Sequence, residues 1–348
     1  MSDNIKTVQV SLDDADYATL PGSSAELSVE TDENENSIYG SEFNSTLPGV
    51  RDFSLSGNAW LRQTPGFRAN VRRAGEPQEF TEEAMEVEDG DTYIIVDRTK
   101  SVWDYNETVE VFDDGVAVDD EDIESIDFLF GRVTFAETAT IDGPVTVTGT
   151  YKPTSVFGCA NEVSLTQNAE AVLDSCFEIT QDEEGFNTYS SGLKDVSMEL
   201  SGFYRQSNDF FELLKDNEQI VVEVDWEGDG ETMTRGVFTV QSTSQSGDVG
   251  QNEEFSVNFS LFVPEDVLPF SWYFGEASKM STGMKYIIEA WINRQNLFVK
   301  YFPEGTANRG FKGETVVTDA SMSTAVDAIG ELSLDTQGTG ELEVLNAT

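Results

Sequence analysis

Alternation of apolar and polar residues predicts β-strands along much of the chain. In the predicted strand at residues 254–263, apolar side chains alternate with polar ones up to Leu261, which is the pattern of a strand with one buried face. Asn208 and Asp209 can cap a short helix at residues 210–215. The further predicted strands of this region are residues 194–204, 219–226 and 235–243. We therefore expect a β-rich unit that contains one helix.

This unit occurs twice, because two stretches of the chain match two others without a gap. Residues 43–67 match residues 186–210 at an offset of 143, with eight of 25 positions identical. Residues 288–334 match residues 211–257 at an offset of 77, with 11 identities in 47 positions. One copy is continuous and the other is split around it, so the sequence predicts a nested duplication.

The split copy and an unmatched segment give the predicted domains. The boundaries are residues 1–85 and 270–348 for discontinuous domain I, residues 86–153 for an insertion, and residues 154–269 for domain II. The insertion contains short alternating segments and an Asp114-Gly115 pair typical of a hairpin turn. The predicted fold class is mainly β: two β-sandwich or half-barrel domains, each with one short helix, plus a small all-β insertion on the surface.

Charge changes this picture more than any other property of the composition. The chain has 348 residues, enough for two or three domains, and its 66 acidic and 20 basic residues give a net charge of −46. The acidic residues are dispersed along the sequence, which favours a carboxylate-coated surface adapted to concentrated salt over a dedicated site for a cationic partner. Nucleic-acid binding by a basic face is disfavoured.

The sequence offers little that could carry catalysis. Histidine is absent, which removes the usual general base and zinc ligand. Cys159 and Cys176 are too far apart for a CxxC site and are interpreted as small core residues, with a disulfide as the alternative. Residues 225–231 start like a calcium loop, but Gly236 occupies the twelfth position, where a bidentate Glu is needed. We predict no enzyme activity, no metal and no cofactor.

The sequence predicts neither a membrane span nor a secretory signal. No run of about 18 apolar residues predicts a membrane span, and the acidic start MSDNIKTVQVSLDD is unlike a secretory signal. We expect synthesis and assembly in a host cytoplasm, without a membrane partner.

Several of the matched segments carry a resemblance to a known family. They are GLKDVSMELSG at residues 192–202, RGVFTVQSTSQS at 235–246, KGETVVTDASMS at 312–323, EEFSVNFSLF at 253–262 and GELSLDTQGTGEL at 330–342. This order of glycine-led alternating strands around a short helix resembles the major tail tube proteins of long-tailed, siphovirus-like viruses. The similarity covers about two thirds of the chain and excludes the insertion.

The resemblance implies a structural protein of the virion tail that assembles with itself into stacked rings around a channel for the viral genome. With a duplicated domain, it implies three chains and six quasi-equivalent tube domains per ring, with a ring of six chains as the alternative. Other tail proteins would be partners, double-stranded DNA would pass without specific binding, and the acidic composition indicates a halophilic host. A baseplate hub, a tail-completion ring and an acidic surface adhesin stay open as alternatives, although the adhesin would need a signal peptide.

A channel wall is predicted from the strand alternation. Residues opposite the apolar set of each strand are expected to face the channel, with an outer sandwich surface as the alternative. The predicted lumen-facing residues are Asp195, Ser197, Glu199, Ser201, Glu254, Ser256, Asn258, Ser260, Asp52, Ser54, Ser56, Glu331, Ser333 and Asp335. Hydroxyls and carboxylates without cations repel phosphates and offer them no contact.

Overall fold

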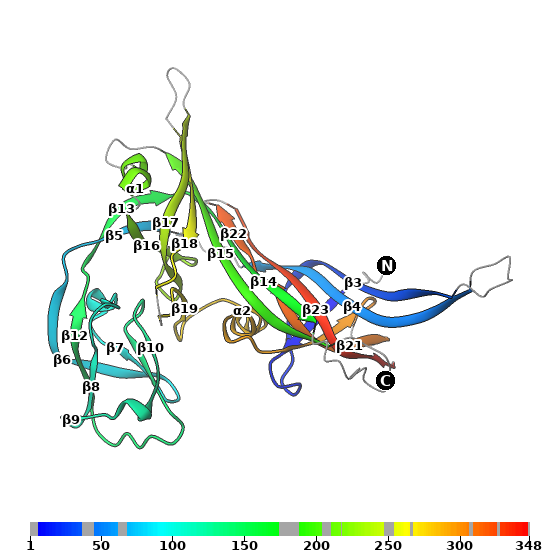
Figure 1. Ribbon diagram of the computed structural model, residues 1–348, viewed down its shortest axis with the longest axis horizontal. Helices are drawn as coiled ribbons and strands as arrows, with labels where there is room; N and C mark the ends of the chain where they lie inside the picture. Colours follow the sequence, from blue (N-terminus) through cyan, green and yellow to red (C-terminus); the bar gives the residue numbers. More distant parts are fainter. Residues whose placement is uncertain are drawn as a thin grey trace.

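The computed structural model describes residues 6–36, 45–61, 68–173, 188–203, 210–216, 218–246, 254–264, 267–305, 309–325 and 328–346. These residues form two β-sheets and two α-helices, so the predicted mainly β fold class is confirmed. Figure 1 shows the smaller sheet at one end of the long axis and the long β3–β4 hairpin at the other.

The larger sheet has 16 strands and contains most of the molecule. Its main path runs β13-β5-β16-β17-β18-β15-β14-β22-β23-β21-β20-β1-β2, with β4 and β3 beside β23 and with β19 beside β17. The strands are β1 Thr7–Ser11, β2 Ala18–Thr19, β3 Gly22–Asn36, β4 Ser45–Leu61, β5 Arg68–Ala74, β13 Thr154–Ala160, β14 Glu162–Leu173, β15 Tyr189–Phe203, β16 Gln219–Asp225, β17 Thr232–Ser246, β18 Glu254–Leu261, β19 Phe270–Phe274, β20 Leu297–Phe302, β21 Gly310–Asp319, β22 Met322–Ala325 and β23 Gly330–Leu345.

The smaller sheet has seven strands in the order β10-β11-β7-β6-β12-β8-β9. They are β6 Gln78–Asp89, β7 Thr92–Ile95, β8 Glu110–Asp113, β9 Val116–Ala117, β10 Ile123–Asp127, β11 Arg132–Phe135 and β12 Val145–Tyr151, with the 3-10 helices η1 Arg98–Lys100 and η2 Asp120–Asp122. The sheet encloses its own core around Trp103, Phe135 and Val147. Its first strand begins at Gln78, before the boundary at residue 86 that the sequence predicted.

The two α-helices differ in length and in burial. Helix α1, Phe210–Asp216, contains the predicted segment 210–215, whereas α2, Thr282–Asn293, is longer. Ser281 caps α2 by accepting a hydrogen bond from the amide of Met284, and the helix ends at Arg294 in a left-handed conformation. Met284, Ile287 and Trp291 place the apolar stripe of α2 in the main core.

The strands divide into two groups with matching registers. We call β3, β4, α2 and β20 to β23 the first group, and β14, β15, α1 and β16 to β18 the second group. In the second group Leu200 lies opposite Val257; in the first, Gly57 lies opposite Leu334, and these residues correspond at the sequence offsets of 143 and 77.

A bulge in each group strengthens this agreement. The register shifts between Val240 and Ser242 where β17 pairs with β18. It shifts again between Val317 and Asp319, at the same offset of 77, where β21 pairs with β23. Because a bulge inserts an additional residue at one defined point of a ladder, its recurrence means that the two groups share pairing details as well as strand order.

A buried arginine joins the insertion to the second group. The guanidinium of Arg235 in β17 donates to Leu129 O and to Ser101 Oγ, both at 2.8 Å, and pairs with Glu223 at 2.8 Å. Burial alone would raise the pKa of Glu223, but Arg235 and Arg72 outweigh burial and hold that pKa below its usual value. The insertion is therefore docked on β16 and β17 by a satisfied polar network.

Candidate functional site

The predicted lumen-facing residues of β15 are on the opposite face from the core. Val196, Met198 and Leu200 are buried, at 2% exposure or less. Asp195 and Glu199, which alternate with them, are exposed. The predicted alternation of this strand is confirmed, because successive side chains of a strand project to opposite faces.

Cross-strand pairs carry this face through the second group and into the first. Residues directly opposite each other in an antiparallel pair project to the same side. Glu199 lies opposite Asn258 of β18 on one side and opposite Ser164 of β14 on the other. Ser164 in turn lies opposite Ser323 of β22, which lies opposite Glu331 of β23.

The first group continues the same face. In β23 and β4, Asp335 lies opposite Ser56 and Ser333 lies opposite Asn58. In β4 and β3, Ser56 lies opposite Glu26 and Asp52 lies opposite Glu30. The structure therefore brings all fourteen predicted residues onto one face of a continuous sheet.

We call this face, with the paired positions that extend it, the polar face. Its acidic members are Glu26, Glu30, Asp52, Glu162, Asp195, Glu199, Glu254, Asp319, Glu331 and Asp335. Its other polar members are Ser24, Ser28, Ser54, Ser56, Asn58, Ser164, Thr166, Asn168, Ser197, Ser201, Thr239, Ser242, Ser244, Ser246, Ser256, Asn258, Ser260, Ser323, Ser333 and Gln337. No member is Lys or Arg.

Sequence reasoning missed the contributions of β3 and β14. In residues 162–169 the alternation was visible, since Val163 and Leu165 alternate with Ser164 and Thr166. The buried Gln167 interrupts the apolar set, because its side chain donates to Ala320 O at 2.6 Å and accepts from the indole of Trp272 at 2.9 Å. A polar residue at a core position hides the strand pattern until its partners are known.

Hydrogen bonds tie the polar face across its strands. Ser256 Oγ donates to Glu199 at 3.0 Å, and Ser201 Oγ donates to Glu162 at 3.0 Å. The pKa of the Asp335 carboxyl is raised, first by burial and then by the nearby Asp319. The face is thus an acidic and hydroxylated surface whose side chains are partly satisfied by one another.

The nearby cation of β15 points to the other side of the sheet. Lys194 Nζ donates to Ile292 O at 2.5 Å and lies 5.0 Å from the centre of the Trp291 ring. It therefore contacts the end of α2 and contributes no positive charge to the polar face.

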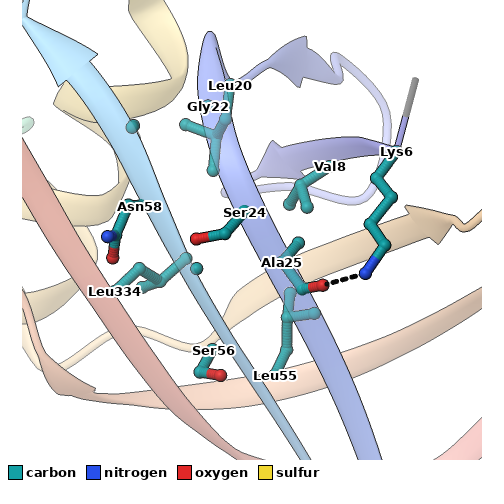
Figure 2. Close-up of a pocket in the computed structure, with 12 residues that line it drawn as sticks. Lys6, Val8, Leu20, Gly22, Ser24, Ala25, Leu55, Ser56, Asn58 and Leu334 are labelled. Atoms are coloured by element: carbon teal, nitrogen blue, oxygen red, sulfur yellow. Dashed lines mark hydrogen bonds between the residues drawn. The ribbon is translucent and has the colours of Figure 1, made fainter. Parts of the chain in front are cut away.

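A cavity of about 300 Å³ opens beside β3 and β4 (Figure 2). It was not predicted from the sequence, because it forms where β1 crosses the hairpin. Figure 2 shows Lys6 donating a hydrogen bond to the carbonyl of Ala25, at 3.2 Å, with Val8 and Leu20 along the same wall. The lining combines aliphatic groups, serines and Asn58, and it includes no nucleophile with an adjacent base.

The turn that resembles the start of a calcium loop is held by its own hydrogen bonds. The Asp225 carboxylate accepts from the amides of Gly228 at 2.7 Å and Gly230 at 3.0 Å. Glu227 accepts from the amide of Lys279 at 2.9 Å. These carboxylates are occupied by backbone donors, and in the described part of the chain no three His, Cys, Asp or Glu side chains gather in a metal-binding arrangement.

Two other expectations from the sequence concern membrane spans and the two cysteines. Neither helix of the described segments is long and apolar enough to cross a bilayer. Cys176 lies outside the described residues, so the interpretation of the two cysteines as core residues, with a disulfide as the alternative, stays a prediction.

Comparisons with known proteins return no family and limited structural likeness. No family model and no curated protein matches the chain. A chain of the "Virion of native gene transfer agent (GTA) particle" is 14% identical with a TM-score of 0.28, and the match covers 34% of this chain and 88% of that one. A chain of the "Tail of empty GTA particle computed with helical refinement, C6 symmetry" is 16% identical with a TM-score of 0.27, covering 34% and 86%. At these scores the likeness assigns neither a function nor an assembly.

Proposed function

We propose that this chain is a non-catalytic structural protein of a virion tail, which assembles with copies of itself into stacked rings, and that the polar face lines the channel. One observation carries the proposal. All fourteen residues predicted to face the channel lie on a single continuous face of the large sheet, opposite the main core.

The chemistry of the polar face suits the passage of DNA. Proteins hold duplex DNA mainly through Lys and Arg contacts to phosphates, which release counterions. A wall of carboxylates and hydroxyls makes no such contacts, and its negative charge keeps phosphates away from it. Double-stranded DNA would therefore slide through without specific binding, as a delivery channel requires.

The matching registers support a chain built from two copies of one tube unit. Leu200 opposite Val257 and Gly57 opposite Leu334 are equivalent pairs, and so are the bulges of β17 and β21. Two similar units in one chain can alternate around a ring, so three chains would supply six quasi-equivalent positions. Other tail proteins would cap the stack at its ends.

Electron microscopy of the purified protein in molar salt tests the assembly. We expect stacked rings with three chains each. Single rings that never stack would favour a baseplate hub or a tail-completion ring, and a monomer at all salt concentrations would overturn self-assembly. An adhesin would require binding to a cell surface without rings.

The orientation of the polar face is tested by labelling an introduced cysteine. Glu199→Cys should react with a polymer-linked maleimide too large to enter the channel when the protein is dissociated, and should be protected in tubes. Asp142→Cys, on an exposed position of the insertion, should react in both states. Labelling of the native cysteines is measured on the unmodified chain and subtracted. Equal labelling of Glu199→Cys in tubes and dissociated protein would place the face on the outside.

A further inference from the structure

The contact between the two groups within one chain has two parts. In the sheet, β14 of the second group pairs with β22 of the first, and Ser164 lies opposite Ser323. Beside the sheet, Trp291 of α2 is 4% exposed because Lys194 of β15 and Phe270 of β19 cover it. The helix of the first group is thus buried under strands joined to the second group.

Among the described residues, the helix of the second group is less covered than α2. At the offset of 77, Leu214 of α1 corresponds to Trp291, and Phe211 corresponds to Ile288. Leu214 is 37% exposed and Phe211 is 49% exposed, against 4% and 0% for their counterparts. Apolar positions that are buried in one copy and exposed in the other indicate a surface that an additional unit covers.

The sheet edges show the same asymmetry. Glu26 of β3 lies opposite Ser56, just as Ser164 of β14 lies opposite Glu199, so Glu26 is the counterpart of Ser164. Ser246 of β17 is the counterpart of Ser323 at the offset of 77. Among the described residues, the strand order gives β3 one neighbour, β4. The end of β17 near Ser246 has β18 as its neighbour. Both segments are therefore edges of the described sheet.

We propose that a second copy of this chain docks on the second group in the way that the second group docks on the first. Strand β3 of the incoming copy pairs with the end of β17, with Glu26 opposite Ser246, and its β4 covers Leu214 on α1. This inference rests on the proposed function, since it supplies the contact by which copies would close a ring. The occupant is a copy of the chain because, in the described residues, the first group carries the matching strands in the matching register.

Charge supports the same docking geometry. Lys194 donates to Ile292 O near the C-terminal end of α2, and its counterpart at the offset of 143 is Arg51, which is exposed in β4. The C-terminal end of α1 carries the exposed Asp216. A cation near the C-terminal end of a helix is favourable, so Arg51 of the incoming copy matches this end of α1.

A disulfide across the proposed strand pair tests the register. Directly opposed residues of an antiparallel pair have Cβ atoms about 4.5–5.5 Å apart, close enough for a disulfide after a small adjustment. The double variant Glu26→Cys with Ser246→Cys is assembled in molar salt, oxidised, and separated on a non-reducing denaturing gel. We expect covalent dimers and a ladder that ends at three chains. The matched control pairs Glu30→Cys with Ser246→Cys, which is out of register by four residues. The unmodified chain and each single variant measure crosslinking through native cysteines.

The outcomes separate this inference from the proposed function. If rings are seen by electron microscopy but the Glu26→Cys, Ser246→Cys variant crosslinks no more than the out-of-register control, the docking contact is wrong. The proposed function is then unaffected. Failure of the unmodified chain to assemble in molar salt would overturn both. A ladder ending at six chains would support the contact and overturn the three-chain ring.

The helix contact has a separate test. Leu214→Glu should raise the protein concentration needed for assembly by about tenfold or more, because a central apolar contact of an interface is replaced by a charge. Val116→Glu makes the same kind of change at a site that is 70% exposed in β9 of the insertion, and it should leave assembly unchanged. If Leu214→Glu and Val116→Glu need the same protein concentration for assembly, β4 of a second copy does not cover α1.

Discussion

At the residue scale, the ring of Phe53 occupies space that two glycines leave open. Phe53 is 2% exposed, and a Cβ added at Gly338 or Gly313 would overlap its ring. Because core packing tolerates little extra volume, these two glycines are required by the neighbouring aromatic side chain.

Gly338→Ala should therefore destabilise the fold by about 1–3 kcal/mol through overpacking. Urea unfolding in high salt measures the loss. Combining it with Phe53→Leu should cost less than the sum of the two single changes, because the smaller side chain leaves room for the new methyl group. Additive losses would show that Gly338 acts through something other than Phe53.

Lys194 gives the fold a defined pH dependence. Burial, with a smaller effect of Arg294, lowers the pKa of Lys194 to about 8, against about 10.4 for an unfolded lysine. Between these values the unfolded chain binds more protons, so the free energy of unfolding rises with pH through this window. We expect this rise in the unmodified chain and not in Lys194→Met. Lys215→Met, at an exposed position of α1, serves as the control. If the free energy of unfolding changed in parallel with pH for the unmodified chain and for Lys194→Met, Lys194 would not be the group that causes the rise.

At the element scale, strand interiors were predictable and some strand partners were not. Alternation located β15 and β18 because each has one apolar face. Strand β5, Arg68–Ala74, was placed with domain I by its position in the sequence, yet it pairs with β13 and β16. Its sequence, RANVRRA, alternates only at Ala69 and Val71, which are buried, and this pattern is too short to indicate the partners of the strand. The cavity beside Lys6 is likewise a product of packing between distant elements.

The docking of the insertion depends on Arg235. Arg235→Met removes one partner of a buried ion pair and leaves Leu129 O and Ser101 without their donor. We expect a loss of about 3–5 kcal/mol in the free energy of unfolding. Arg73→Met breaks a more exposed pair with Glu218 at 2.6 Å and should cost about 0–1 kcal/mol. If urea unfolding shows that Arg235→Met and Arg73→Met lower the free energy of unfolding by comparable amounts, the Arg235 network does not anchor the insertion.

At the scale of the whole molecule, charge determines when copies can associate. Each chain carries −46, and stacking would bring many such charges together. The screening length is about 3 Å in 1 M salt and about 30 Å at 0.01 M. We expect assemblies formed in molar salt to dissociate on dialysis to low salt and to return when salt is restored. Light scattering follows both steps, and sucrose at equal osmolarity should not replace the salt. Scattering that stays constant through dialysis would contradict this dependence.

Introducing positive charge on the polar face tests the channel directly. Asp195→Lys with Glu199→Lys places two ammonium groups on one strand of that face, at exposed positions, so the fold and the rings should persist. If the face lines the channel, these groups form phosphate contacts that must be broken as DNA moves, and genome ejection from virions that carry the variant should slow or stall. The matched control, Asp120→Lys with Glu121→Lys, makes the same charge change at exposed positions of η2, and virions that carry it should eject DNA at the normal rate.

Ejection is timed by the fluorescence of a dye that binds released DNA. Slowing should weaken as salt rises, because each contact is electrostatic, whereas a structural defect would not respond in this way. A normal ejection rate for the Asp195 and Glu199 variant would exclude the polar face as the channel wall.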